Sequence, residues 1–267
     1  GKSVCTSNKE LVAEHGAELL EIARQKKVNF LFEASVGGGI PIIRPLNQSL
    51  TADEIMEITG IVNGTTNYIL TKMSREGQTF EAALSKAQEL GYAERNPEAD
   101  VEGYDAGRKL AILASLAYGM QVDYEDIYME GITKLTDVDF QYAEALDAEI
   151  KLLVSGKREG DSFYAMVAPK MIRSDNPLYS VQDVFNAILV RGNMLGDVMF
   201  YGSGAGKLPT ASAVVADVVD AVKHQGKNIM TIWSNKKLAL SDRMEAENNF
   251  FVRVPRAEEM RAREAFP

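Results

Sequence analysis

The residues best suited to chemistry lie in the stretch EADVEGYDAGRKLAIL, residues 98–113, which places a carboxylate at Asp105 and an amine at Lys109. The surrounding positions are mostly apolar and favour a helix. Side chains four residues apart on a helix project from the same face, about one turn apart, so both groups can reach one small molecule. An acid and an amine placed in this way are suited to moving a proton to or from a bound substrate.

Spacing alone favours a simpler interpretation, an exposed salt bridge worth only about 0.3–0.5 kcal/mol. Two further features favour a functional pair. The preceding loop supplies carboxylates at Glu94, Glu98 and Asp100, and the other helical positions are mostly Ala, Leu and Ile, which indicates burial. A buried charge must be paired or serve a function, so the segment becomes a candidate active site.

Composition excludes several classes of function. The net charge of −9 is spread along the 267 residues, and no Lys/Arg stripe with interleaved aromatics appears, so neither nucleic acid nor an anionic membrane is expected as a partner. A single cysteine excludes a disulfide framework, and two histidines leave no transition-metal cluster. No apolar run is long enough for a membrane span, and the start lacks the apolar core of a signal peptide. We therefore expect a cytoplasmic protein. Because the chain lacks an initial Met and ends at REAFP, we also expect it to be part of a longer protein.

Helices and strands must position the candidate residues. The predicted helices are a segment from Asn8 to about Lys26, a short one ending at Leu50, one entered through Thr65 or Thr66 and ended at Gly77, one from Thr79 to Gly91, one ending near Gly119, and one over ASAVVADVVDAVKH. The predicted strands are VNFLFEAS, EIMEITGIV, a hairpin over EIKLLVSGKREGDSFYAMVAPKMI, a second hairpin over NAILVRGNMLGDVMFYG, and a short strand FFVRV near the end.

Glycine-rich loops are typical of nucleotide-binding motifs, which also require fixed spacings. In YGSGAGKL, a phosphate-binding P-loop would need Gly at position 201 and Ser or Thr at 208, where the chain has Tyr201 and Leu208. The third glycine of a Rossmann fingerprint would fall on Lys207. No complete nucleotide fingerprint is present, although the glycines permit close approach of the backbone to a cofactor or a cation.

Five separated motifs, taken in order, resemble the homoserine dehydrogenase family: TSNKELVAEHG, FEASVGGGIPII, GIVNGTTNYIL, ELGYAERNPEADVEGYDAGRKLAIL and GDVMFYGSGAGKLPTASAVVADV. The resemblance covers about residues 1–225. It implies the NAD(P)-dependent interconversion of aspartate semialdehyde and homoserine, with homodimers formed through the sheet. The N-terminal Rossmann segment of that family, with its glycine fingerprint, has no counterpart here.

The resemblance also implies roles for individual residues. Lys109 would be the acid/base, with Asp105 positioning both lysine and substrate, and Glu94 would bind the substrate ammonium. The remaining implied residues are Tyr92, Thr65 and Asp100 in the substrate pocket, Lys9, Gly91 and Gly204 at the cofactor, and Glu33, Val36, Gly38 and Ile40 as ligands of a monovalent cation, usually sodium. For Glu33 the alternative is a carboxylate that simply caps neighbouring amides.

We therefore predict an α/β protein, α+β in its substrate domain, with a mixed and mostly antiparallel sheet covered by helices on one face. Residues 1–35 are predicted to be the end of a dinucleotide-binding domain, 36–225 the substrate and catalytic domain, and 226–267 a linker with the possible start of a regulatory domain. Two alternatives stay open: a catalytically incompetent fragment for dimerisation and substrate binding, and another amino-acid dehydrogenase with the same substrate-domain plan.

Overall fold

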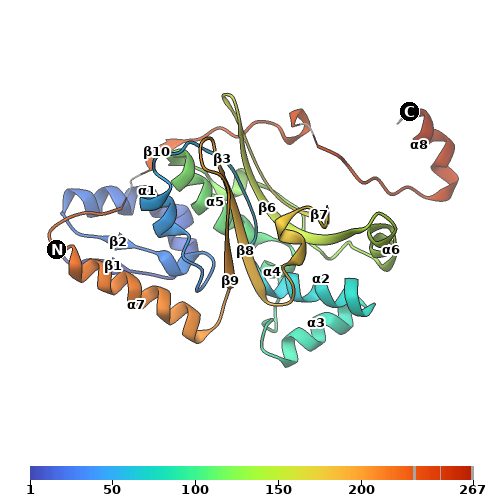
Figure 1. Ribbon diagram of the computed structural model, residues 1–267, viewed down its shortest axis with the longest axis horizontal. Helices are drawn as coiled ribbons and strands as arrows, with labels where there is room; N and C mark the ends of the chain where they lie inside the picture. Colours follow the sequence, from blue (N-terminus) through green and yellow to red (C-terminus); the bar gives the residue numbers. More distant parts are fainter. Residues whose placement is uncertain (231–232, 247, 266–267) are drawn as a thin grey trace.

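A six-stranded sheet forms the centre of the molecule in the computed structural model, which describes residues 1–230, 233–246 and 248–265 (Figure 1). Its strands follow the order β5-β7-β6-β3-β8-β9. They are β3 (Ile55–Ile61), β5 (Tyr128–Met129), β6 (Ala148–Glu159), β7 (Ser162–Arg173), β8 (Phe185–Gly192) and β9 (Gly196–Ser203). Neighbouring strands are antiparallel except β5 and β7, which run parallel. The predicted mixed, mostly antiparallel sheet is confirmed.

Both predicted hairpins are present. β6 pairs with β7 from Ala148↔Arg173 to Glu159↔Ser162, and β8 pairs with β9 from Phe185↔Ser203 to Gly192↔Gly196. Each connection uses a glycine with positive φ, Gly160 at 59° and Gly196 at 76°. A side chain is strained in that left-handed region, which explains why glycine occurs at these turns.

The α-helices are α1 (Lys9–Gln25), α2 (Gly64–Glu76), α3 (Phe80–Glu89), α4 (Glu98–Val101), α5 (Tyr104–Tyr118), α6 (Asp137–Ala145), α7 (Lys207–Lys223) and α8 (Glu259–Ala265). Shorter helical turns are η1 (Glu33–Ser35), η2 (Pro45–Ser49), η3 (Tyr124–Asp126), η4 (Pro177–Ser180), η5 (Arg243–Glu245) and η6 (Arg256–Glu258). Among the described residues, no helix has the length and apolarity that crossing a bilayer requires.

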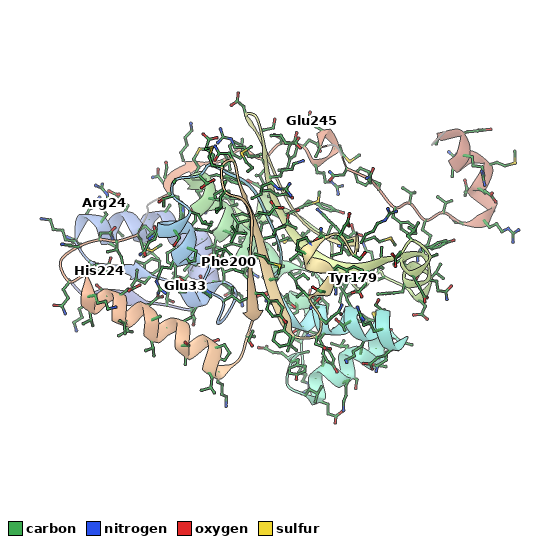
Figure 2. All side chains as sticks on the ribbon, in the orientation of Figure 1. Arg24, Glu33, Tyr179, Phe200, His224 and Glu245 are labelled. Atoms are coloured by element: carbon green, nitrogen blue, oxygen red, sulfur yellow. The ribbon has the colours of Figure 1, made fainter. Side chains whose placement is uncertain are left out.

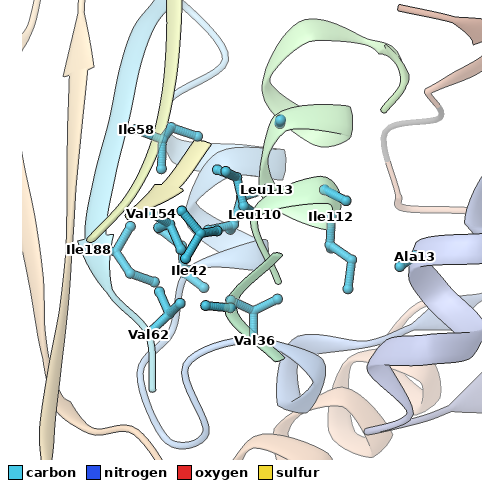
Figure 3. Close-up of a cluster of buried hydrophobic side chains, with 14 of the residues drawn as sticks. Ala13, Val36, Ile42, Ile58, Val62, Leu110, Ile112, Leu113, Val154 and Ile188 are labelled. Atoms are coloured by element: carbon cyan, nitrogen blue, oxygen red, sulfur yellow. The ribbon is translucent and has the colours of Figure 1, made fainter. Parts of the chain in front are cut away.

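Helix α5 covers one face of the sheet, and the main core lies between them (Figure 3). Ile58, Val154 and Ile188 from three neighbouring strands face Leu110 and Leu113 of the helix, and all five side chains are at most 1% exposed. Burying such side chains stabilises the fold by about 1.5–3 kcal/mol each. This packing fixes α5 on the sheet, and with it the orientation of the helical face that carries Asp105 and Lys109.

A smaller unit lies on the other side of α5, where α1 and α7 flank a two-stranded parallel sheet (Figure 1). Its strands are β1 (Val4–Cys5) and β2 (Phe30–Leu31). The Asn29 side chain donates to the carbonyl of Lys227 at 2.8 Å, and Asn228 donates to the carbonyl of Val28 at 2.9 Å. The chain after α7 is therefore tied to the N-terminal unit.

Trp233 fixes the returning chain further. Its side chain is 1% exposed, its ring meets Phe32 edge-on at 5.9 Å between centroids, and its Nε1 donates to Gln121 Oε1 at 2.9 Å. The neighbouring strand β10 (Ser234–Lys237) pairs in parallel with β4 (Met120–Gln121). Residues 233–237 thus pack against the body of the protein, within the segment 226–267 predicted as a linker; residues 231–232, 247 and 266–267 of that segment lie outside the described residues.

Four details differ from the sequence-based predictions. The strand predicted over VNFLFEAS is only Phe30–Leu31, because β1 offers just two partner residues and the chain then turns into η1. The predicted helix around the candidate pair is broken at Gly103, whose φ of +85° ends α4 and starts α5. Helix α2 is capped by Asn63, one residue before Gly64, instead of by Thr65 or Thr66.

The fourth difference concerns FFVRV, residues 250–254, which forms no strand. The segment lies beside α6, where Phe251 packs against Tyr142 at 5.5 Å between ring centroids and Arg253 donates to Asp139 at 2.7 Å. These side-chain contacts hold the segment on α6, and it pairs with no described strand. The following α8 projects from the body of the molecule (Figure 1).

Candidate active site

The candidate pair lies where the end of β3 meets the first two turns of α5. Asp105 is in the first turn of the helix and 5% exposed, and Lys109 follows one turn later. Lys109 Nζ donates to Asp105 Oδ2 at 2.6 Å and to the backbone carbonyl of Val62 at 2.8 Å. The predicted convergence of the two side chains on one helical face is present, and β3 supplies a second anchor for the lysine.

A second amine completes the cluster. Lys9, at the start of α1, places Nζ 2.9 Å from Asp105 Oδ1, so one carboxylate is shared by two lysines from different helices. The exposed fraction of the side chains rises from Asp105 at 7% through Lys109 at 13% to Lys9 at 37%. The cluster therefore extends from a buried carboxylate to the surface, with Lys9 the most exposed of the three side chains.

Asn63 is a residue that the sequence analysis missed as part of the site. Its Nδ2 donates to Asp100 Oδ1 at 2.7 Å and to Asp105 Oδ2 at 2.9 Å, while its Oδ1 accepts from the N–H of Thr66 at 2.9 Å. One amide thus caps α2 and orients two carboxylates. The signal in the sequence was an Asn-Gly pair directly before a helix, a pattern typical of an N-cap, but nothing in it indicated that the same amide reaches α5.

The charges shift one another in opposite directions. Burial by itself raises the pKa of Asp105, but the charges of Lys109 and Lys9 outweigh it and hold that pKa well below its ordinary value. Partial burial acts to lower the pKa of Lys9, and Asp105 reverses this effect and raises it. Burial raises the pKa of Asp100, and the hydrogen bond from Asn63 acts in the opposite direction without cancelling the rise. Asp105 is therefore ionised at neutral pH. The neighbouring carboxyl group of Asp100 takes up a proton more readily than an ordinary aspartate does.

The other predicted substrate residues lie on the α2 and α3–α4 side of the cluster. Thr65 Oγ1 donates to the backbone carbonyl of Tyr92 at 2.6 Å, which ties the start of α2 to the loop after α3. The ring of Tyr92 packs against Tyr68 at 5.3 Å between centroids. Glu94 is exposed on the same loop, and its carboxylate has neither an ion pair nor a hydrogen bond with any other described residue. Gly91 has φ of +76°, and a Cβ placed on it would meet open space.

The glycine loop after η1 packs against the loop before α7. A Cβ on Gly38 would lie 2.4 Å from the carbonyl oxygen of Gly204, and a Cβ on Gly204 would lie 2.0 Å from Asn186 Nδ2. The two backbones are therefore in contact, which only glycine permits. Asn186 is fully buried, and neither polar atom of its side chain has a partner among the described residues. Because buried amides are nearly always bonded, the unused donor and acceptor of Asn186, on β8 beside Gly204, could serve a ligand.

Glu33 lies at the base of this loop, on the side of the molecule formed by α1 and α7 (Figure 2). It is 3% exposed, and its Oε1 accepts from the N–H groups of Ile42 and Ile43 at 2.6 and 2.9 Å. Its Oε2 accepts from the N–H of Arg44 at 2.8 Å. The carboxylate therefore caps the following helical turn, as the simpler interpretation expected, and one lone pair of Oε2 is left over.

An ion-pair network joins this loop to α7. Asp217 Oδ2 accepts from the N–H of Glu33 at 2.9 Å, and Asp217 Oδ1 accepts from the Arg44 guanidinium at 2.9 Å. Asp220 binds the same guanidinium at 2.7 Å. Burial raises the pKa of Asp217 to about 6, although the Glu33 amide and Arg44 act against it. Through these bonds α7 fixes the position of η1, the turn after β2 that begins with Glu33.

Comparison with known proteins identifies the family of the chain. The homoserine dehydrogenase family profile matches residues 41–219. The chain is 51% identical over 225 residues to a homoserine dehydrogenase of Synechocystis sp., covering 83% of this chain and 52% of that protein. It is 47% identical over 223 residues to the Bacillus subtilis homoserine dehydrogenase, covering 84% of this chain and 52% of that protein. The chain thus spans about half the length of the curated relatives that it matches.

Solved structures show the same relationship. A homoserine dehydrogenase from Thiobacillus denitrificans superimposes with a TM-score of 0.84 at 42% identity, covering 89% of this chain and 58% of that one. A hyperthermophilic archaeal homoserine dehydrogenase in complex with NADPH gives a TM-score of 0.73 at 36% identity, covering 83% and 64%. The chain belongs to the homoserine dehydrogenase family.

Proposed function

We propose that this chain carries the substrate-binding and catalytic part of a homoserine dehydrogenase, which interconverts L-aspartate 4-semialdehyde and L-homoserine in the biosynthesis of threonine, methionine and isoleucine. The observation that carries the proposal is the buried Asp105 shared by Lys109 and Lys9 in a member of this family. Reduction of an aldehyde to an alcohol requires a hydride at the carbonyl carbon and a proton at its oxygen. A bound dinucleotide would supply the hydride in its reduced form, NADPH or NADH, and would accept it in the reverse direction as NADP or NAD.

Lys109 is proposed as the proton donor and acceptor. An ammonium has three N–H groups, and Asp105 and the Val62 carbonyl use two of them, so one remains for the substrate oxygen. Asp105 is proposed to hold the lysine in place and to contact the substrate. Because the carboxylate stays ionised, it keeps Lys109 oriented throughout the reaction.

Recognition of the amino acid is assigned to the neighbouring loop. Glu94, which is exposed and unpaired among the described residues, is proposed to bind the substrate ammonium through a charge-assisted hydrogen bond. Tyr92, Thr65 and Asp100 are proposed to complete the pocket. The hydrogen bond between Thr65 and the carbonyl of Tyr92 supports this proposal because it holds the loop next to the start of α2.

Lys9, Gly91 and Gly204 are proposed to contact the dinucleotide. Two observations indicate that these residues fit such a group: Gly91 leaves its backbone open, and the buried Asn186 amide beside Gly204 has unused hydrogen-bonding capacity. Lys9 would offer its remaining N–H groups to a phosphate or carboxylate oxygen at the border of the two binding regions.

A sodium ion is proposed at Glu33 and the backbone carbonyls of Val36, Gly38 and Ile40. These three residues are buried, and their carbonyl groups accept no hydrogen bond from another described residue, while Glu33 retains one lone pair. Oxygen donors of this kind suit a hard cation. The ion would stabilise the loop that packs on Gly204. Replacing sodium by a bulky organic cation should lower the melting temperature of the protein if the site is real, and an unchanged melting temperature would exclude it.

A homodimer through the outer face of the sheet is proposed, on the face opposite α5. Phe185, Met199 and Tyr201 are 39%, 40% and 53% exposed there, and the rings of Phe185 and Tyr201 stack at 5.4 Å between centroids. Exposed apolar patches of this kind mark association surfaces. Tyr201→Glu should shift the mass measured by light scattering to that of a monomer. The control Ile22→Glu, at an exposed position on α1, should leave the dimer intact; equal masses for both variants would contradict the proposal.

The proton-transfer role is tested by substituting Lys109. Lys109→Ala should abolish turnover, and Lys109→Arg should be equally inactive because a guanidinium keeps its charge but does not release a proton at neutral pH. The control Lys86→Ala changes an exposed lysine on α3 and should retain full activity. Near-normal turnover of Lys109→Arg would refute the proton-transfer role while leaving a purely electrostatic one.

A second candidate is a substrate-binding module that binds no nucleotide by itself. It is favoured by two observations: the chain spans about half of its relatives' length, and it carries no complete dinucleotide fingerprint. Calorimetric titration of this polypeptide with homoserine, NADH and NADPH separates the two cases. Homoserine binding without nucleotide binding would assign the module, and binding of both ligands would assign a self-sufficient site. We expect either form to act in the cytoplasm.

A further inference from the structure

A cavity of about 110 Å³ opens between the outer face of the sheet and the chain that follows β10. One water needs only roughly 10–15 Å³ of such space, so the cavity can hold a small ligand. Its inner wall is formed by Ser155 and Lys157 of β6 and by Lys170 of β7, and Arg243 of η5 closes it from outside. Figure 2 shows Glu245, at the end of the same turn η5, where this chain segment passes the sheet.

Positive charge dominates the lining. Lys157, Lys170 and Arg243 all border the cavity, whereas Glu57 is the one carboxylate among the described lining residues. That carboxylate is already engaged, since it accepts from Thr59 at 2.9 Å and from Arg191 at 3.0 Å. A surplus of cations at one cavity is unexpected in a chain whose net charge is −9.

Two of the three cations have no carboxylate partner among the described residues. Lys170 Nζ donates to Ser155 Oγ at 3.0 Å and forms no ion pair with a described residue. The Arg243 guanidinium lies 3.6 Å above the ring of Tyr128, and its N–H groups are left without an acceptor in the described chain. Lys157 differs, because it pairs with Glu159 near the hairpin turn.

The surroundings of Lys170 disfavour the charged form of its amine. Burial lowers the pKa of its amine and Lys157 acts in the same direction, with Glu57 as the opposing charge. A partly buried ammonium without a counter-ion is costly, and an anion in the cavity would remove that cost. The residues that would hold it lie mainly on β6 and β7, whose register is continuous over twelve residue pairs, so the site is rigid before any ligand arrives.

We propose that this cavity binds a small oxyanion, the phosphate or carboxylate group of a small molecule, held by Lys170, Arg243 and Ser155. The ammonium provides a point charge, the guanidinium provides a planar fork of donors that fits two oxygens at once, and the serine hydroxyl provides a further donor. The site is separate from the Asp105–Lys109 cluster, which lies on the face of the sheet that α5 covers. The inference therefore stands independently of the proposed dehydrogenase activity.

Calorimetric titration of the purified protein with inorganic phosphate and, separately, with acetate tests the proposal at low ionic strength. Lys170→Met should weaken binding by about tenfold or more, because a charged hydrogen bond is worth about 1.5–3 kcal/mol. Arg243→Gln should act in the same direction. Lys223→Met removes an exposed lysine at the end of α7 and is the matched control, for which unchanged binding is expected.

The two anions distinguish the source of the ligand. Binding of phosphate alone assigns a phosphate group, binding of acetate alone assigns a carboxylate, and either result supports the site. Absence of binding for both anions, or binding to Lys170→Met as tight as to the unchanged protein, overturns the proposal. A second measurement follows the lysine directly: in spectra of ¹³C-methylated protein, saturating anion should raise the pKa of Lys170, and an unchanged pKa would contradict the site.

Discussion

Asp105→Asn tests the electrostatic structure of the site without reference to catalysis. The substitution preserves shape but removes the charge that accepts from Lys109 at 2.6 Å and from Lys9 at 2.9 Å. Breaking a buried ion pair costs about 3–5 kcal/mol because the remaining charge is left without compensation. Lys9 is 37% exposed and regains hydration, so we expect a loss near the lower end, about 3 kcal/mol at pH 7. This is a large part of the roughly 5–15 kcal/mol that stabilises a typical domain.

The pH dependence of that loss provides the decisive assay. The pKa of Asp105 in the folded protein lies below its ordinary value of 3.8, so its stabilising contribution is complete above that value and decreases as the pH falls towards the folded pKa. Urea unfolding followed by circular dichroism should therefore show a smaller difference between the unchanged protein and Asp105→Asn at pH 3 than at pH 7. Equal differences at both pH values, or a loss under about 1 kcal/mol at pH 7, would refute the reasoning.

Two further substitutions test how the site and the small N-terminal unit are held. Asn63→Ala should lower the free energy of unfolding in urea by about 1–3 kcal/mol, because Asp100 loses its amide donor and α2 loses its cap. The control Asn96→Ala, on the exposed loop, should change it by less than about 0.5 kcal/mol. Trp233→Ala should lower the free energy of unfolding by about 3–5 kcal/mol, because it removes a buried ring and leaves Gln121 Oε1 unbonded. Trp233→Phe should lower it less. Equal melting temperatures for the unchanged protein and both variants would show that residues 233–237 do not stabilise the fold.

Elements with strong local signals were predictable from the sequence. The cap at Asn8, the glycine at 77 that ends α2, and the glycine turns of both hairpins depend on backbone preferences within a few residues. The Asp105–Lys109 pair was predictable for the same reason, since helical geometry alone brings residues four apart together. Such features need no knowledge of the tertiary fold.

Contacts between distant segments could not be read from local patterns. Lys9 reaches Asp105 across 96 positions, and Trp233 reaches Gln121 across 112, so both depend on how the helices pack. The polar run around Trp233 was interpreted as a linker because a single aromatic residue gives no periodic signal. The strand prediction for FFVRV was wrong for a related reason. The segment has the composition of a strand, but a strand also needs a partner strand, which local composition does not reveal.

The geometry of the cluster also explains why two amines share one carboxylate. Asp105 accepts three donors, from Lys109, Lys9 and Asn63, so its own bonding capacity is nearly used. Each ammonium, by contrast, keeps at least one N–H free. Under the proposed function, a substrate would meet donors from the lysines and an acceptor from Glu94 on the loop. This arrangement matches a zwitterionic amino acid with a carbonyl or hydroxyl oxygen, since its oxygens need donors and its ammonium needs a carboxylate. The buried pair fixes the position of Lys109. Under the proposed function, the exposed Lys9 and Glu94 would select the molecule that reaches it.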